Sequence, residues 1–187
     1  MPIEREFKYV LRMDRGLESY IMERLEELQP TVIQIRQGYL TKGGRVRSKV
    51  ITHVMGKVID NPSPSYYFTF KHTLTKRPGD LEFEMSIPES DFNLAWTEEV
   101  DEKLTKVRYV IGSGVGTTWE VDFFKHSGYT YLVLAECEVH ANGNAPEELP
   151  SVIGDNLLFA VPEGDKRFQN RRLCDEKKVT KLLKEIA

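Results

Sequence analysis

Apolar and charged side chains alternate in the first residues of the chain, from Ile3 to Tyr9. Successive side chains of a strand point to opposite faces, so Glu4, Glu6 and Lys8 share one face, while the other is mostly apolar. This pattern predicts a strand with one charged face. A single strand of this kind is common on a solvated surface, so its meaning depends on whether the pattern recurs.

The pattern does recur, each time as charged residues two apart with an apolar residue beside them. The recurring positions are Arg45 and Arg47, Lys71, Glu82 and Glu84, Lys106 and Arg108, Glu120 and Asp122, and Glu136 and Glu138. Strands are predicted around them at 31–41, 45–52, 66–73, 81–85, 106–111, 118–126 and 129–140. Together with the first strand, these make about eight.

Three further segments have the apolar spacing of amphipathic helices, and each follows a residue that can cap a helix: Asp14, Ser90 and Asp175. The apolar stripes are Leu17, Ile21, Leu25 and Leu28, then Phe92, Ala95, Trp96 and Val100, and finally Val179, Leu182, Leu183 and Ile186. Residues 56–65 read as a loop, and residues 147–160 as a short irregular helix.

Strands this polar on one side can close into a barrel, so that the charged faces meet around a wet interior. The expected fold class is therefore α+β: a closed eight-stranded antiparallel β-barrel with a charged interior and helices packed on its outside. The helices should cover the outward apolar residues Phe7, Phe83, Val107, Tyr109, Val121 and Phe123. Such a barrel is a binding tunnel.

With these residues the chain resembles the triphosphate tunnel metalloenzymes, also called CYTH proteins. Glu4, Glu6 and Lys8 match the family's Glu-x-Glu-x-Lys signature. The Arg-x-Arg motif and the strand lysine are matched by Arg45, Arg47 and Lys71. The later pairs follow the family's order of acidic and basic strands, and segments 37–40 and 164–170 are also similar. The resemblance covers nearly the full length.

The resemblance implies a divalent-metal-dependent triphosphatase. Arg binds phosphate bidentately and Lys binds it as a point charge, so the expected substrate-binding residues are Lys8, Arg45, Arg47, Lys71, Lys106, Arg108 and Arg167. The expected metal ligands are Glu4, Glu6, Glu82, Glu84, Glu120, Asp122, Glu136 and Glu138. Catalytic roles are expected for Glu4, Glu6, Lys8, Glu120 and Asp122. Oxygen ligands favour Mg²⁺ or Mn²⁺, with two ions per site.

Length and composition fit this interpretation. A chain of 187 residues with 40% hydrophobic content suits a single domain over residues 1–187. The net charge of -3 gives no general attraction to nucleic acid. Cys137, Cys174 and the four histidines are scattered, which argues against zinc. We expect a cytoplasmic protein without a membrane span, either a monomer or a homodimer.

The expected reaction is hydrolysis of inorganic tripolyphosphate to pyrophosphate and orthophosphate, because the chain is short and shows no extra domain for a polymer or a transcript. Two alternatives within the family are a class IV-type adenylyl cyclase and a thiamine triphosphatase. Another is a non-catalytic polyphosphate or nucleotide sensor. A cyclase needs a slot for a base, and Tyr66, Tyr67 and Phe68 offer rings that could stack on one, although the pattern favours core or rim packing for them.

Overall fold

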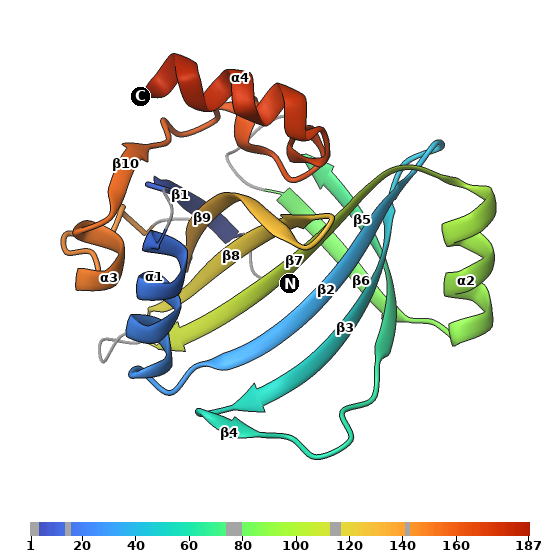
Figure 1. Cartoon of the computed structure of the whole chain (residues 1–187). Coiled ribbons are helices and arrows are strands. Elements are labelled where there is room, and N and C mark those ends of the chain that lie inside the picture. The colour runs from blue at the N-terminus through green and yellow to red at the C-terminus, as the bar shows by residue number, and fades with distance from the viewer. Residues whose placement is uncertain (1–3, 14–15, 74–79, 113–116, 141–142) are drawn as a thin grey trace.

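The computed structural model describes residues 4–13, 16–73, 80–112, 117–140 and 143–187 (Figure 1). Strands dominate it. The elements are β1 (Glu4–Leu11), α1 (Leu17–Glu26), β2 (Thr31–Leu40), β3 (Arg45–Val54), β4 (Lys57–Val58), β5 (Ser65–Thr73), β6 (Asp80–Ser86), α2 (Glu89–Glu98), β7 (Val100–Gly112), β8 (Thr118–His126), β9 (Tyr129–His140), α3 (Ser151–Gly154), β10 (Leu157–Ala160), two 3₁₀ turns, η1 (Lys166–Phe168) and η2 (Arg172–Cys174), and α4 (Glu176–Ile186).

All strands belong to one antiparallel sheet in the order β10-β1-β6-β5-β3-β2-β7-β8-β9, with β4 on β3 and an additional pairing of β1 with β9. The eight predicted strands are therefore confirmed, as is the α+β class. The closed eight-stranded barrel is wrong, because the sheet has ten strands and is not closed. On one edge of β1, the residues from Tyr9 to the end of the strand pair with β10. Among the described residues, β6 reaches that edge only at the pair Glu4–Asp80.

Three local predictions are corrected as well. Strand β4 lies in the predicted loop, and β10 lies in the predicted helix, since its backbone finds hydrogen-bonding partners on β1. Helix α2 follows Pro88 without a side-chain cap, because the Ser90 hydroxyl bonds to Asp91 instead. By contrast, Asp175 caps α4 through the amides of Lys177 and Lys178, as predicted. The Asp14 cap falls outside the described residues.

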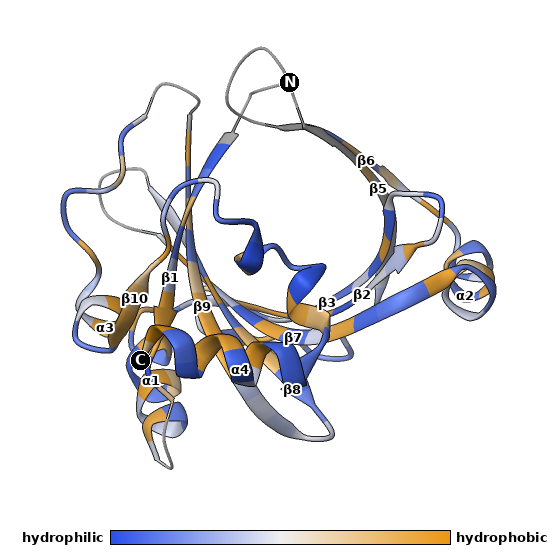
Figure 2. Ribbon diagram, turned by 90° about the horizontal axis from the view of Figure 1, so that it is seen from above, coloured by the Kyte–Doolittle hydropathy of each residue, from blue (hydrophilic) through white to orange (hydrophobic). Residues whose placement is uncertain are grey.

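The outer face of the sheet carries one apolar core. Helices α1 and α3 pack there on strands β1, β7, β8 and β9, and Trp119, Val121 and Phe123 are buried beneath them. Figure 2 looks down the curled sheet and shows α1, α2 and α3 on its outside. The predicted coverage is incomplete: Phe83 on β6 stays 48% exposed. No helix in the described part of the chain is long and apolar enough to cross a membrane.

A second apolar core lies on the concave face, beside the charged residues. Val10 follows Lys8 two positions along β1, so both point to the same side. The strands contribute Val10, Leu104, Phe124, Leu132 and Leu134, and the C-terminal segment adds Phe168, Leu173, Val179 and Leu182. Helix α4 therefore covers one end of the curled sheet rather than packing against its outside (Figure 2). Cys137 is buried, Cys174 is half-buried and both are free thiols.

Candidate functional site

The charged residues of the concave face form two groups. The acidic wall comes from β1, β7, β8 and β9 and comprises Glu6, Lys8, Lys106, Arg108, Glu120, Asp122, Glu136 and Glu138, five carboxylates and three bases. The basic wall comes from β3 and β6 and comprises Arg45, Arg47, Lys49, Glu82 and Glu84, three bases and two carboxylates. Strand β2 separates β3 from β7, so the walls are neighbours in one sheet.

Arg108 lies at the centre of the acidic wall. Its Nε and Nη2 atoms each donate to the Asp122 carboxylate at 2.7 Å, which is the bidentate geometry of a strong ion pair. The same guanidinium contacts Glu120 and, at 3.4 Å, Glu136. Asp122 is fully buried. Three carboxylates thus converge on one cation, and two of them, Asp122 and Glu136, are almost completely buried.

Lys8 links the two ends of this cluster. Its ammonium group donates to Glu6 at 2.8 Å and to Glu136 across the β1–β9 ladder. Burial alone would lower the pKa of Lys8, but attraction by Glu136 and Glu6 raises it above its usual range. Likewise, burial would raise the pKa of Glu136, while Lys8, Lys106 and Arg108 hold it well below its usual range. These groups therefore stay charged together.

Lys106 is the most buried base of the acidic wall. It donates to Asp122 and, at 3.3 Å, to the side-chain oxygen of Asn170 in the C-terminal segment. Burial and the neighbouring Arg108 lower its pKa to about 8. The segment that closes one end of the sheet thus contacts the charged cluster directly.

The basic wall holds its charges more loosely. Arg45 bonds to Glu82 at 2.7 Å, and Lys49 bonds to Glu84 at 3.0 Å. Arg47 is 3.5 Å from Glu84. The Nε atom of Arg45 is buried, and no described residue accepts its hydrogen bond. A buried donor without an acceptor is costly, so this atom is suited to a ligand oxygen.

The two walls influence one another electrostatically. Burial, followed by repulsion from Arg45 and Arg108, lowers the pKa of Arg47 to about 10. Arg108 belongs to the acidic wall, so its charge reaches across β2. The two walls therefore form one electrostatic site.

Two residues of this site were missed by the sequence reasoning. Lys49 continues the two-residue spacing of Arg45 and Arg47, so the spacing itself could have identified it. Gln37 is fully buried, accepts from Arg47 Nε at 3.0 Å and donates to the Tyr39 hydroxyl at 2.6 Å. It orients Arg47, and a neutral residue in a predicted strand gives no charge pattern to reveal this.

The structure does not bring every predicted residue to the site. Arg167 pairs with Asp165 at 2.7 Å and lies 3.9 Å from Glu185, with its side chain half exposed. The side chains of Glu4 and Lys71 lie outside the described part of the structure, although the β-ladders pair Glu4 with His140 and Lys71 with Glu82. Glu82 and Glu84 lie with the bases of the basic wall.

Carboxylate oxygens are suitable ligands for a hard cation such as Mg²⁺. In the structure, the side-chain cation of Lys8 is bound by Glu6 and Glu136. The side-chain cation of Arg108 is bound by Glu120, Asp122 and Glu136. Within the described ranges, no three His, Cys, Asp or Glu side chains are grouped closely enough to form a metal site. A divalent ion would therefore have to compete with the two bases.

No protein-family model matches the chain, and no curated protein matches it in sequence. Among solved structures, the inorganic triphosphatase NE1496 is similar with a TM-score of 0.50 and 20% identity, over 93% of this chain and 95% of that one. PH1819 from Pyrococcus horikoshii OT3 has a TM-score of 0.46 and 17% identity, over 98% of this chain and 90% of that one. A putative adenylyl cyclase from Hippeastrum, described as having a dominant triphosphatase activity, has a TM-score of 0.45 and 12% identity. The match covers 74% of this chain and 80% of that one.

The similarity to NE1496 is at the level of the fold. It confirms the triphosphate tunnel fold that the sequence resemblance implied, in a chain of nearly the same extent.

Proposed function

We propose that the protein hydrolyses inorganic tripolyphosphate to pyrophosphate and orthophosphate, with a divalent cation as cofactor. The observation that carries this proposal is the buried Arg45 Nε without an acceptor, on a wall where bases outnumber carboxylates. This N–H donor is available to bind an anionic oxygen of a ligand. The fold shared with an inorganic triphosphatase supports the same substrate class.

The basic wall binds the phosphate oxygens in this proposal. Arg45 and Arg47 present guanidinium forks, and Lys49 supplies a mobile point charge. Their carboxylate partners Glu82 and Glu84 are partly exposed, with side chains 36% and 30% accessible, so exchanging them for phosphate costs little. Gln37 holds Arg47 in place during this exchange.

The acidic wall provides the cation site. Glu6, Glu120, Asp122, Glu136 and Glu138 would hold Mg²⁺ or Mn²⁺, which neutralises phosphate charge and lowers the pKa of bound water. Lys106 and Arg108 lie among these carboxylates. In this proposal their charges stabilise the negative charge that develops on the leaving phosphate. Burial of the wall strengthens each of these interactions.

Two observations favour an inorganic substrate over a nucleotide. The C-terminal segment packs its apolar side chains against the strands at one end of the concave face, so Phe124 and its neighbours there are buried and cannot stack on a base. The ring of Tyr67, the aromatic residue opposite Arg47, is already covered by Lys49, whose ammonium lies 4.4 Å from the ring centroid. Tyr66 packs on Phe92 instead.

The decisive experiment is turnover of tripolyphosphate, ATP and thiamine triphosphate with Mg²⁺ or Mn²⁺, with the products identified. We expect pyrophosphate and orthophosphate from tripolyphosphate at a higher kcat/KM than for either organic substrate. Cyclic AMP as the main product from ATP would instead establish a cyclase. Binding of all three without turnover would establish a sensor.

A further inference from the structure

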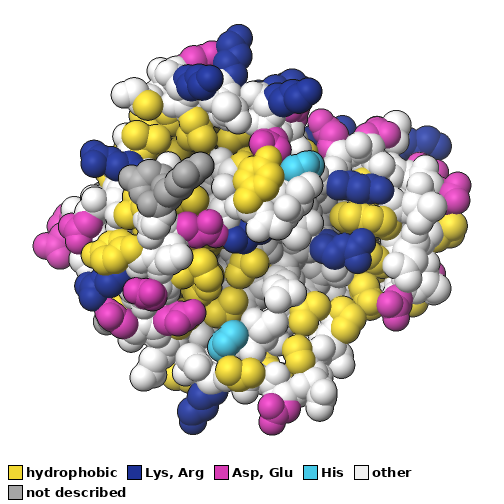
Figure 3. Space-filling view, viewed as in Figure 1, with side chains coloured by type: hydrophobic (Ala, Val, Ile, Leu, Met, Phe, Trp, Pro, Cys, Tyr) yellow, Lys and Arg dark blue, Asp and Glu magenta, His cyan; other side chains and the backbone are white. Residues whose placement is uncertain are grey.

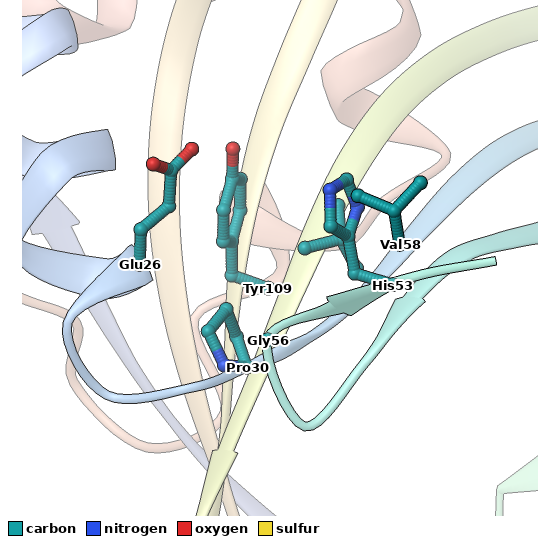
Figure 4. Close-up of a pocket in the computed structure, with 7 residues that line it drawn as sticks. Glu26, Pro30, His53, Gly56, Val58 and Tyr109 are labelled. Carbon is teal, nitrogen blue, oxygen red and sulfur yellow. The ribbon is translucent and has the colours of Figure 1, made fainter.

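A separate cavity of about 170 Å³ opens on the outer side of the sheet, away from the charged face. The end of α1, strands β2 and β7 and the β3–β4 hairpin enclose it (Figure 4). Its apolar lining comes from Pro30, Val32 and Val58.

The rim of this cavity is firmly built. The Gly56 amide donates to the Pro30 carbonyl at 2.9 Å, which ties the β3–β4 turn to the segment after α1. A Cβ on Gly56 would lie 3.3 Å from Gln29 Cα, and Gly56 has φ 73. Gln29 and Met55 also have left-handed backbones, with φ 52 and φ 48. Strained residues meeting at one place are more common at binding sites than elsewhere.

Three polar side chains line the cavity, and Figure 4 shows those of Glu26, Tyr109 and His53 extending in the same direction. Tyr109 as a whole is only 4% exposed, and Figure 4 shows its hydroxyl at the end of the ring that extends alongside Glu26. Glu26 is exposed at the end of α1, and its carboxylate lines the cavity. His53 Nδ1 lies 3.0 Å from Thr52 Oγ1, which leaves Nε2 for another partner.

The charges of this lining select the ligand. Glu26 is its carboxylate, and none of the described residues that line the cavity is a Lys or an Arg. Burial, together with the neighbouring Glu26, raises the pKa of the Tyr109 hydroxyl. The phenol therefore remains neutral near pH 7 and can accept a hydrogen bond from a cation while its ring face attracts positive charge.

We infer that this cavity binds a small alkylammonium ion. The ammonium group donates to Glu26 and to the Tyr109 oxygen, and the alkyl stem packs on Pro30, Val32 and Val58. Water occupies roughly 30 Å³ per molecule in the liquid, so the cavity has room for a ligand about the size of five or six waters, such as a four-carbon amine. The inference does not depend on the proposed triphosphatase activity.

The test is a ¹H–¹⁵N NMR titration of the full chain with n-butylammonium chloride at constant chloride concentration. We expect saturable shifts of the Gly56 amide with a Kd on the order of 1 mM, as suits a ligand of this size. Glu26→Gln should weaken binding at least tenfold, and Tyr109→Phe about threefold. Glu23→Gln, an exposed position on the same helix, should leave binding unchanged, and butan-1-ol should produce no saturable shift.

The inference is overturned if the Gly56 amide does not shift saturably, or if Glu26→Gln binds the amine as well as the unmodified chain. Resonances of residues far from the cavity report whether each variant is folded. Glu26 is exposed at the end of α1, so this variant keeps the fold and the result remains interpretable.

Discussion

The two walls of the concave face contain the same kinds of side chain, but the main carboxylate partners of their bases differ in burial. In the acidic wall, the Asp122 and Lys106 side chains are 0% and 2% accessible. In the basic wall, the Lys49 and Glu84 side chains are 25% and 30% accessible. Buried charges need their partners for the fold to persist, whereas partly exposed pairs contribute little. The ion pairs of the acidic wall are therefore needed for the stability of the fold as well as for the site. Those of the basic wall can be exchanged for contacts with a ligand at little cost in stability.

The largest effect should come from Asp122→Asn, which removes the shared partner of Lys106 and Arg108 and leaves two buried cations less well paired. We expect the free energy of unfolding to fall by about 3–5 kcal/mol. Urea denaturation measures it. The matched change on the other wall, Glu84→Gln, should cost about 1 kcal/mol or less. Equal losses at the two sites would abolish the distinction between the walls.

Divalent ions should act on the acidic wall, where carboxylates outnumber bases by two. At about 100 times its Kd, Mg²⁺ should stabilise the protein by about 2.7 kcal/mol. Excess chelator should reverse this and abolish turnover. Thermal unfolding with and without Mg²⁺ measures the first effect. Full activity in chelator would contradict the assignment of the acidic wall as the cation site.

Arg45→Gln tests the basic wall. It removes the guanidinium whose Nε lacks an acceptor, so KM for tripolyphosphate should rise about 10- to 100-fold, equivalent to about 1.4–2.7 kcal/mol of binding. Stability should change little, because the Arg45 partner Glu82 is partly exposed. Steady-state kinetics together with urea denaturation separate the two effects. An unchanged KM would place the phosphates elsewhere.

The smallest effect concerns pH. Burial would raise the pKa of Glu84, but its bond to Lys49 and the charges of Lys49 and Arg47 lower it below 4.5. A lowered carboxyl pKa stabilises the fold above the unfolded value and loses this contribution as pH falls through the folded pKa. The stability difference between the unmodified chain and Glu84→Gln, about 0.5–1 kcal/mol at pH 7, should therefore shrink below pH 4.5. A difference that grows on acidification would contradict the sign.

The strands could be predicted from the sequence because their period of two is local. Ladder pairs such as Glu6–Glu138 and Arg108–Asp122 then bring the predicted charges together. The competition between β10 and β6 for one edge of β1 could not be predicted, because it depends on pairings between residues far apart in sequence, Tyr9 with Ala160 and Glu4 with Asp80. The inner apolar core was also missed, because Val10 and Leu134 look like ordinary strand residues until Phe168 is placed against them.

The position of β1 has a consequence for how the molecule is made. This strand is synthesised before the other strands of the sheet, yet its longer ladders are with β9 and β10, and the inner core also needs Phe168 and Leu173. Contacts so distant in sequence slow folding and keep early strand edges exposed. On the ribosome, the long ladders of β1 therefore form only after β9 and β10 have emerged, and the charged interior assembles late.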